Sequence, residues 1–365
     1  MKKILFSAYS LDFGGIETAL ITLLKYLKDE YEIVLVLEKK QGMFLKDLPE
    51  NIKVITYTPS ELKFVPLRKI VNAFKRLRFI LKYKNKFDFA ADFATYSKPA
   101  SFVARTASKN SAIWVHNNYM NFYDNDIVMY RKFFDELNIR DFKKIVFVSE
   151  LDKKVFIAQY PELSKRWIVC NNLIDYKKIE KLAKEEIPKE ELKLINKRDE
   201  TVFLNVGRHD EKQKKISRII DASERLKKEG YKFKIILIGK GSNTKEYEKA
   251  IKTKKLENNI YMLGAKKNPY PYFKFADYFC MSSQFEGYPV VLVESQVLGL
   301  PILTTNISDA KKDLEGKYGL VVENSSNGVY KGMKKVLKDG IKTIKFDAEK
   351  YNLEIVEKVR KIIND

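Results

Sequence analysis

The chain has 365 residues, of which 45% are hydrophobic and 32% are charged. This length accommodates two domains of ordinary size, and the composition excludes a disordered protein. The net charge of +21 indicates an anionic partner, such as a phosphorylated substrate, an anionic membrane surface or a nucleic acid. No apolar run approaches the ~18 residues of a membrane-spanning helix. The two cysteines, Cys170 and Cys280, argue against a disulfide framework and suit a reducing cytoplasm.

The N-terminal half alternates between predicted strands and helices. An apolar strand over residues 4–8 is followed by a turn at Gly14 and Gly15 and by helical periodicity over 18–27. Further apolar runs cover 32–37, 113–116 and 144–149. Strands that are apolar on both sides and separated by helices predict a parallel sheet covered on both faces.

Next along the chain, residues 62–86 hold nine Lys or Arg and no Asp or Glu. Apolar residues recur there at helical spacing, namely Leu67, Ile70, Val71, Phe74, Leu77 and Leu81. The segment therefore reads as a basic amphipathic helix that can lie on anionic lipid headgroups. Its expected membrane-facing cations are Arg68, Lys69, Lys75, Arg76, Arg78 and Lys82. The alternative is a helix that packs its apolar stripe on its own domain and leaves its charges in water.

The strand pattern restarts at residue 201, with apolar runs at 201–206, 234–238, 261–263, 278–281 and 301–304. Two such halves predict two Rossmann-like α/β domains facing a central cleft, with ligands outside the carboxyl ends of the strands. We expect a first domain over 1–185, a second over 186–345, and a C-terminal helix over 346–365 that could pack back on the first domain.

The most informative stretch runs from Ser282 to Pro301 and contains two glutamates eight residues apart, Glu286 and Glu294. It follows a strand and enters a helix with Pro289 near the first turn, where a missing N–H is harmless. Free N–H groups at a helix start suit a diphosphate, and the two carboxylates could accept hydrogen bonds from sugar and ribose hydroxyls. Acidic residues near helix starts are also common for dipole reasons alone.

Cations follow a strand nearby in the sequence. Gly207 and Arg208 come directly after 201–206, and Lys214 and Lys215 precede the next helix. A guanidinium and an ammonium there could clamp a diphosphate leaving group, although surface solvation is the usual fate of both residue types.

In these motifs the whole chain resembles the retaining glycosyltransferases of family 4, which have two Rossmann-like domains in the GT-B arrangement. The family's E-x7-E pattern is matched by Glu286 and Glu294 within EGYPVVLVES, its GGxE by residues 14–17, and its GR…K by Arg208 and Lys214. Two features depart from the family pattern. Arg208 and Lys214 are six residues apart rather than the commoner five, so Lys212 or Lys215 could replace Lys214, and residues 239–241 read Gly-Lys-Gly without the usual acidic residue.

The resemblance implies a role for each matched residue. Arg208 and Lys214 would stabilise the departing diphosphate, Glu286 would hold the donor sugar, Glu294 would bind the ribose, and His116 would contact the sugar near the reacting carbon. His116 could instead be a hydrogen-bonded loop histidine, and His209 is expected to be structural or solvent-facing. The implied donor-binding residues are Gly14, Gly15, Gly207, Gly264, Gly287, Tyr288, Pro289, Val290, Val291 and Glu294.

The resemblance therefore implies a retaining hexosyltransferase, and we expect it to need neither a metal nor a cofactor. Its donor is expected to be a nucleotide-diphosphate sugar, with UDP preferred and GDP or ADP open, and its acceptor a glycan or a lipid-linked precursor of a bacterial cell-surface polysaccharide such as capsule or lipopolysaccharide. Asp124-Asn125-Asp126 resembles a metal-binding D-x-D, but we expect no metal because the cation pair would do the same electrostatic work. The expected location is cytoplasmic, peripheral at the inner face of the plasma membrane. A nucleotide-sugar epimerase or hydrolase on the same scaffold is the alternative; no nucleic-acid-binding element is recognisable.

Overall fold

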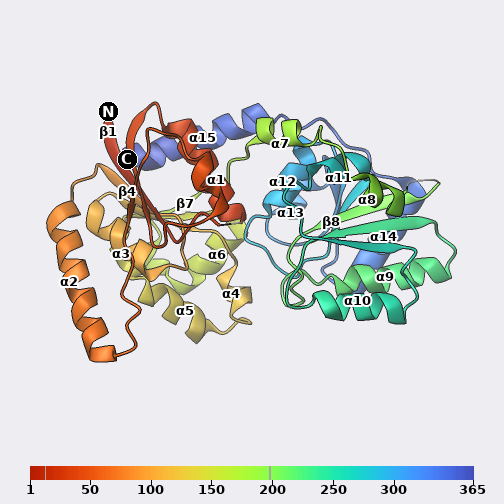
Figure 1. The fold of residues 1–365 in the computed structure, drawn as a ribbon, viewed down its shortest axis with the longest axis horizontal. Helices are drawn as coiled ribbons and strands as arrows, with labels where there is room; N and C mark the ends of the chain where they lie inside the picture. The colour runs from red at the N-terminus through yellow and green to blue at the C-terminus, as the bar shows by residue number, and fades with distance from the viewer. Residues whose placement is uncertain (13, 197–198) are drawn as a thin grey trace. The chain divides into compact units, whose positions relative to one another are not determined.

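Two parallel sheets, one of seven strands and one of six, organise the computed structural model, which describes residues 1–12, 14–196 and 199–365 (Figure 1). The chain divides into two compact units: unit 1 comprises residues 1–174 and 350–365, and unit 2 comprises residues 175–349. The α/β class with a parallel sheet in each half, predicted from strands that are apolar on both sides, is confirmed.

The sheet of unit 1 has the strand order β3-β2-β1-β4-β5-β6-β7, in which β1 lies between β2 and β4 and is buried from Ile4 to Ala8. Ile4 of β1 lies opposite Ile33 of β2 on one side and Phe89 of β4 on the other. The strands are β1 (Lys2–Ala8), β2 (Tyr31–Leu37), β3 (Lys53–Thr56), β4 (Phe89–Asp92), β5 (Ser111–Val115), β6 (Lys144–Phe147) and β7 (Trp167–Val169).

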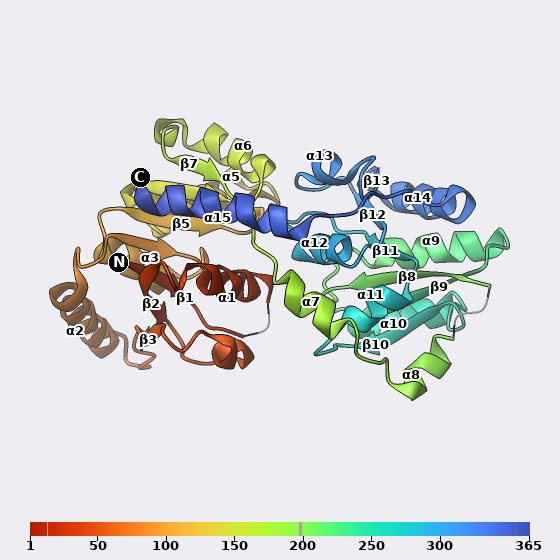
Figure 2. The ribbon, with the colours of Figure 1, turned by 90° about the horizontal axis from the view of Figure 1, so that it is seen from above.

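Helices cover both faces of this sheet, with α1 and α15 on one face and α3 and α5 on the other (Figures 1 and 2). The elements of unit 1 are α1 (Gly15–Leu27), η1 (Met43–Asp47), α2 (Val65–Tyr83), α3 (Lys98–Ala107), α4 (Tyr119–Phe122), α5 (Ile127–Glu136), η2 (Ile139–Asp141), α6 (Glu150–Gln159), η3 (Pro161–Leu163) and most of α15 (Ala348–Asn364).

The basic segment forms α2, and Phe79 is its one buried side chain among the described residues. The Phe79 ring packs against Tyr57 and Phe102. Five of the six stripe residues predicted from the sequence are exposed: Leu67, Ile70, Phe74, Leu77 and Leu81. The alternative that this stripe packs on its own domain is therefore wrong.

Helix α15 is tied to unit 1 by polar contacts along its last turns. Lys144 Nζ donates to the carbonyl of Ile362 at 2.6 Å, and Asn110 donates to the carbonyl of Ile363 at 3.0 Å. The guanidinium of Arg360 forms two hydrogen bonds to the carboxylate of Glu30. These contacts explain why residues 350–365 belong to the first unit although they end the chain.

The sheet of unit 2 has the order β10-β9-β8-β11-β12-β13, all parallel. Its strands are β8 (Thr201–Val206), β9 (Phe233–Ile238), β10 (Ile260–Gly264), β11 (Tyr278–Met281), β12 (Ile302–Thr305) and β13 (Gly319–Val322). The chain moves outward from β8 to β9 and β10 and then returns to place β11 on the other side of β8, where Phe203 lies opposite Tyr278. Because of this reversal, the topological switch point of the sheet lies between β8 and β11, at their carboxyl ends.

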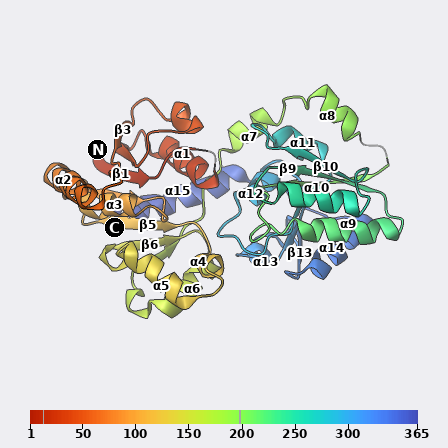
Figure 3. The same cartoon turned by 60° about the horizontal axis from the view of Figure 1, so that its bottom comes forward.

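The helices of unit 2 are α7 (Tyr176–Leu182), α8 (Lys189–Leu194), α9 (Ser217–Lys228), α10 (Thr244–Thr253), α11 (Tyr270–Phe275), α12 (Val290–Val297), α13 (Ala310–Leu314) and α14 (Ser326–Asp339), seen from a second direction in Figure 3. Buried residues of α9, α10 and α14 share one core cluster with strands β8, β9 and β12. Within residues 1–12, 14–196 and 199–365, no helix has the length and apolar character needed to cross a bilayer.

The boundary between the units lies at 174/175 and not at the predicted 185/186. Asp175 accepts a hydrogen bond from the backbone N–H of Lys178 and so begins α7. Asn268 of unit 2 donates to the carbonyl of Leu182 and to the carboxylate of Glu185. These bonds attach residues 175–185 to the second unit.

Candidate active site

The carboxyl ends of β8 and β11 bring two loops together at the switch point of the second sheet. The loop after β8 runs from Gly207 to Ile216, and the loop after β11 runs from Ser282 to Pro289. The two loops are joined by backbone hydrogen bonding from Gln284 N–H to the carbonyl of Gln213 at 2.7 Å. Parallel α/β sheets bind ligands at this position.

Glu286 is buried in this region and accepts three hydrogen bonds. Lys214 Nζ donates to its Oε1 at 2.6 Å, Ser283 Oγ donates to the same oxygen at 2.8 Å, and Gln213 Nε2 donates to Oε2 at 3.0 Å. Glu286 is 7% exposed, and the pairing of its carboxylate with an ammonium group offsets the cost of burying the charge. The structure thus joins two of the residues that the sequence singled out.

Arg208 enters the same network through a residue that the sequence analysis did not name. Its guanidinium donates to Gln213 Oε1 at 3.2 Å, and Gln213 in turn donates to Glu286. Arg208 is exposed, whereas Lys214 and Glu286 are mostly buried. One glutamine therefore links both predicted catalytic side chains across the two loops.

Among the three candidate lysines, the loop conformation brings Lys214 to the carboxylate. Lys215 has a positive φ of 49°, and its ammonium lies 3.9 Å from Glu211. Ser282 Oγ donates to the backbone carbonyls of Lys214 and Lys215 and fixes this bend. The spacing of six residues between Arg208 and Lys214 therefore still delivers an ammonium to Glu286.

Glu294, the second glutamate of the pair, lies one turn inside α12 and is bonded to a tyrosine. Tyr270 donates its hydroxyl proton to Glu294 Oε1 at 2.9 Å. Burial raises the pKa of Glu294 to about 7, and the Tyr270 hydroxyl partly opposes that rise. Tyr270 was not assigned from the sequence, because its contact with Glu294 joins helices α11 and α12. Ser283 was not assigned either, although it lies only three residues before Glu286 in the same loop.

The predicted donor-binding run lies where α12 begins. Gly287 is buried and its carbonyl accepts a hydrogen bond from Ser308, while residues 288–291 are partly exposed. Pro289 is the N-cap of α12, and no side chain caps this helix in the described structure. Gly264 ends β10 with a φ of 68°, a left-handed conformation that favours glycine.

In the Gly239-Lys240-Gly241 turn the structure explains the two glycines, but not the lysine between them. A side chain at Gly239 would come within 1.8 Å of the carbonyl oxygen of Gly207, and one at Gly241 within 2.4 Å of the carbonyl oxygen of His209. His209 is buried, with its Nδ1 3.0 Å from the Thr244 hydroxyl. The solvent-facing reading of His209 is therefore wrong, and its Nε2 atom has no hydrogen-bond partner among the described residues.

In unit 1, His116 follows β5 and is buried, with its ring 4.6 Å from that of Phe93. Neither ring nitrogen meets the geometry of a hydrogen bond among the described residues, although the backbone of Phe93 lies close enough to raise the pKa of the ring slightly. Burial lowers the pKa of His116 to about 3, and the imidazole is neutral at physiological pH. Buried polar groups without partners are rare in proteins, and one at the carboxyl end of a strand suggests a ligand contact.

The glycine motif of unit 1 lies at the start of α1. Gly14 is the N-cap with an extended backbone, and Gly15 is the first helical residue. Glu17 accepts a hydrogen bond from the Tyr96 hydroxyl at 3.2 Å, and burial raises the pKa of this carboxyl. The predicted donor-binding glycines of unit 1 thus lie beside a partly buried carboxyl.

The D-x-D segment has a local role. Asp126 accepts hydrogen bonds from the backbone N–H groups of Val128 and Met129 and caps α5. Across the described ranges, no group of three or more His, Cys, Asp or Glu is arranged to hold a metal ion.

Comparison with known proteins agrees with this geometry. Residues 184–353 match the family model "Glycosyl transferases group 1". Over 354 residues the chain is 28% identical to N-acetylgalactosamine-N,N'-diacetylbacillosaminyl-diphospho-undecaprenol 4-alpha-N-acetylgalactosaminyltransferase of Campylobacter jejuni, covering 93% of this chain and 91% of that protein. It is also 26% identical over 208 residues to an uncharacterised glycosyltransferase of Methanocaldococcus jannaschii, a match that spans 55% of this chain and 49% of that one.

The fold is similar to that of a solved structure, Anabaena HepE in complex with UDP and glucose. The TM-score is 0.75 at 20% sequence identity, over 99% of this chain and 100% of that one. At this identity the likeness concerns the fold, and it places the two parallel sheets in the GT-B class. Residues 184–353 therefore match the model of the group 1 glycosyltransferases, and the chain as a whole has the GT-B fold.

Proposed function

We propose that the enzyme is a retaining, family 4 hexosyltransferase that uses a nucleotide-diphosphate sugar and needs neither a metal nor a cofactor. Unit 2 would hold the donor and unit 1 the acceptor. The observation that carries the proposal is the network at the switch point, in which Lys214 and Gln213 bind Glu286 and Gln213 also binds Arg208. This network supplies two cations and a carboxylate at the carboxyl ends of the strands, where such sheets bind ligands.

The same network suggests how the reaction would be promoted. When the bond between the anomeric carbon and the diphosphate breaks, negative charge develops on the leaving group. Lys214 and Arg208 would stabilise that charge, which is the work that a metal ion does in other transferases. Glu286 would accept hydrogen bonds from sugar hydroxyls, and Glu294 from the ribose.

The start of α12 and the end of β10 would complete the donor site. The uncapped start of α12, next to Gly287 and Tyr288, offers backbone N–H groups to a phosphate. Gly207 and Gly264 would leave room for the backbone to approach the nucleotide. His116 of unit 1 would contribute its unpaired ring nitrogens to the transferred sugar.

For the donor we propose UDP-hexose, and for the acceptor a glycan or a lipid-linked precursor of a cell-surface polysaccharide, such as capsule or lipopolysaccharide. Support comes from the names of similar proteins: HepE was solved with UDP and glucose, and the Campylobacter jejuni relative acts on a diphospho-undecaprenol saccharide. A further relative is an Escherichia coli O-antigen biosynthesis glycosyltransferase, 24% identical over 342 residues. A lipid-linked acceptor would place the enzyme in the cytoplasm, peripheral at the inner face of the plasma membrane.

A thermal-shift panel of UDP-, GDP- and ADP-hexoses tests the donor, because a ligand that binds only the folded state raises the melting temperature. We expect UDP-sugars to give the largest rise. Incubating the best donor with and without acceptor then separates the functions. A transferase consumes the donor at a high rate only with acceptor, and the product should keep the anomeric configuration by NMR. Conversion of donor alone would favour the epimerase or hydrolase, which the comparisons do not favour.

A further inference from the structure

Helix α2 carries an exposed apolar row on the side that faces away from its own unit. The row contains Leu67, Ile70, Phe74, Leu77 and Leu81, at alternating spacings of three and four residues. This spacing keeps the side chains on one strip of a helix, and the strip is about 21 Å long at ~1.5 Å per residue. Phe79, which anchors α2 to its unit, lies about half a turn around the helix from the middle of the row.

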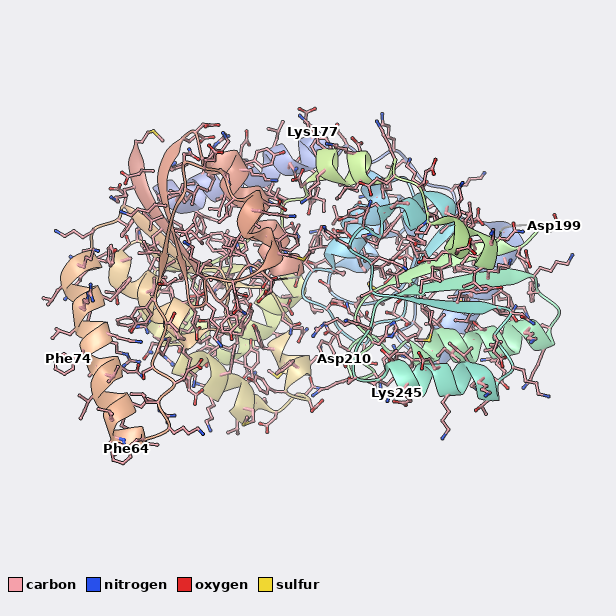
Figure 4. All side chains as sticks on the ribbon, in the orientation of Figure 1. Phe64, Phe74, Lys177, Asp199, Asp210 and Lys245 are labelled. Atoms are coloured by element: carbon pink, nitrogen blue, oxygen red, sulfur yellow. The ribbon has the colours of Figure 1, made fainter. Side chains whose placement is uncertain are left out.

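The exposed apolar residues of α2 are contiguous, unlike scattered surface apolar residues. Phe74 is 69% exposed and Leu81 is 76% exposed, and Phe64 at the N-cap of α2 is 67% exposed. Figure 4 shows Phe64 and Phe74 directed away from the ribbon of unit 1. A contiguous row of this kind on the surface marks a site of interaction with another body.

Cations border the row on both sides. Lys69 and Arg78 are exposed and flank it, and a hollow of about 470 Å³ on the row is lined by Phe74, Leu77 and Leu81 together with Arg78 and Lys82. Two of the six predicted cations are exposed but also contact their own unit. Lys75 donates to the carbonyl of Thr58, and Arg76 lies over the ring of Phe102.

The positive charge of the segment distinguishes between two possible binding partners of the row, a second copy of α2 and an anionic bilayer. Heptad spacing could also serve a coiled coil with a second copy of α2, but the segment 62–86 has nine cations and no acidic residue. Two copies would therefore oppose like charges with no ion pair to offset them. An anionic bilayer instead offers hydrocarbon to the row and headgroup phosphates to its borders.

We infer that α2 binds the enzyme to anionic membranes by inserting the row Leu67–Leu81 at the headgroup boundary, with Lys69, Arg78 and Lys82 contacting lipid phosphates. The inference deepens the proposed membrane location by assigning it to one helix face and one lipid class. It does not depend on which sugar is transferred. The buried core of unit 1 stays intact, since Phe79 and its aromatic neighbours lie on the opposite side of the helix.

Vesicle co-sedimentation of the full chain tests the inference. We expect binding to vesicles of phosphatidylglycerol and phosphatidylcholine, and little binding to phosphatidylcholine alone. The double variant K69E/R78E should lose affinity about a hundredfold, because each basic residue near the surface contributes roughly a fivefold factor and the reversal adds repulsion. The matched control K249E/K252E changes the net charge equally on α10 of unit 2 and should bind as the wild type does.

The apolar contribution is tested by Phe74→Ser with Leu81→Ser, which replaces two exposed side chains and should leave the melting temperature unchanged. We expect at least a tenfold loss of vesicle binding. Wild-type binding by this variant or by K69E/R78E would overturn the inference. So would a wild-type dimer that dissociates in the serine variant without vesicle binding, because the row would then be a contact between copies.

The result is separable from that of the proposed function. Transfer to a short water-soluble acceptor should be unchanged in the α2 variants, since they lie outside the donor site. Vesicle binding without transfer in any protein, the wild type included, would refute the proposed reaction but still support membrane binding by α2.

Discussion

The polar side chains near the carboxyl ends of the strands differ between the two sheets in how many of them already have hydrogen-bond partners. At the edge of unit 2, Glu286 has three donors and Glu294 has one. At the edge of unit 1, both ring nitrogens of His116 and the Oδ2 atom of Asp92 are buried without partners among the described residues. Among the described residues, the carboxyl end of the unit 2 sheet leaves one such atom, Nε2 of His209, whereas that of unit 1 leaves three.

This difference has a consequence for energy. A buried polar group without a partner costs about 1–3 kcal/mol, so unit 1 stores an unfavourable term that a ligand could relieve. The paired network of unit 2 has no such cost, but a donor must compete with the contacts that Lys214 and Gln213 already make. We therefore expect substitutions in unit 2 to remove function by loss of charge, and substitutions in unit 1 to separate function from stability.

The largest expected effect comes from Lys214→Ala. Removal of the buried ammonium should lower kcat by about a thousandfold or more, because it deletes a charge that would stabilise the leaving diphosphate. The matched control is Lys215→Ala, whose ammonium lies near Glu211. That variant should retain activity within a few-fold. Equal losses in both variants, measured by transfer kinetics and checked by thermal unfolding, would refute the assignment of Lys214.

His116→Phe should lower kcat by about 10- to 100-fold while leaving the melting temperature equal or higher. An apolar ring of similar shape removes two unsatisfied nitrogens and keeps the contact with Phe93. If His116 were only structural, stability would fall and activity would follow it. Calorimetry and single-turnover kinetics on the same samples distinguish the two outcomes.

The pH dependence of stability sharpens this prediction. The pKa of His116 is lowered to about 3 in the folded state, so the folded chain takes up its proton later than the unfolded chain. The contribution of neutral His116 to the free energy of unfolding is fully present above its ordinary pKa of about 6.5 and is lost as the pH falls toward 3. In His116→Phe that loss should disappear from the unfolding curves between pH 6 and pH 4.

Much of the fold and the main site could be predicted from the sequence, for physical reasons. Strands such as β1 and β9 are apolar on both faces, which is the pattern of a parallel sheet between helices. Glu286 and Lys214 follow strands of one sheet, and neighbouring strands of a parallel sheet end at the same edge. The prediction needed no knowledge of side-chain conformation.

The remaining features depend on contacts that local sequence does not encode. Gln213 and Tyr270 reach their glutamates across different loops, so no spacing rule identifies them. The domain boundary was misplaced because the sequence does not show which unit the segment after Asp175 packs on. Asp175 caps a helix, and the hydrogen bond from Asn268 to Leu182 is what attaches that segment to unit 2. The direction of the apolar row on α2 was undetermined because Phe79 gives that helix a second apolar side.

Tyr270→Phe should have the smallest effect and acts on binding. The hydroxyl of Tyr270 donates to the Glu294 carboxylate and so holds its pKa lower than burial alone would set it. Without that bond the pKa should rise above about 7, and at pH 7 a larger fraction of Glu294 should be protonated and unable to accept two ribose hydroxyl protons. We expect UDP to bind about tenfold more weakly, by calorimetry, with kcat nearly unchanged.

The dependence of UDP affinity on pH distinguishes this role from a structural one, because a tyrosine with only a structural role would not shift its midpoint. For Glu294 the folded pKa is raised, so its contribution to stability is present below the ordinary pKa of about 4.5 and is lost as the pH rises through about 7. Donor affinity should run in the opposite direction, because the ionised carboxylate is the better acceptor. The midpoint of UDP affinity against pH should therefore shift upward in Tyr270→Phe, and a midpoint equal to that of the wild type would show that the Tyr270 hydroxyl does not tune Glu294.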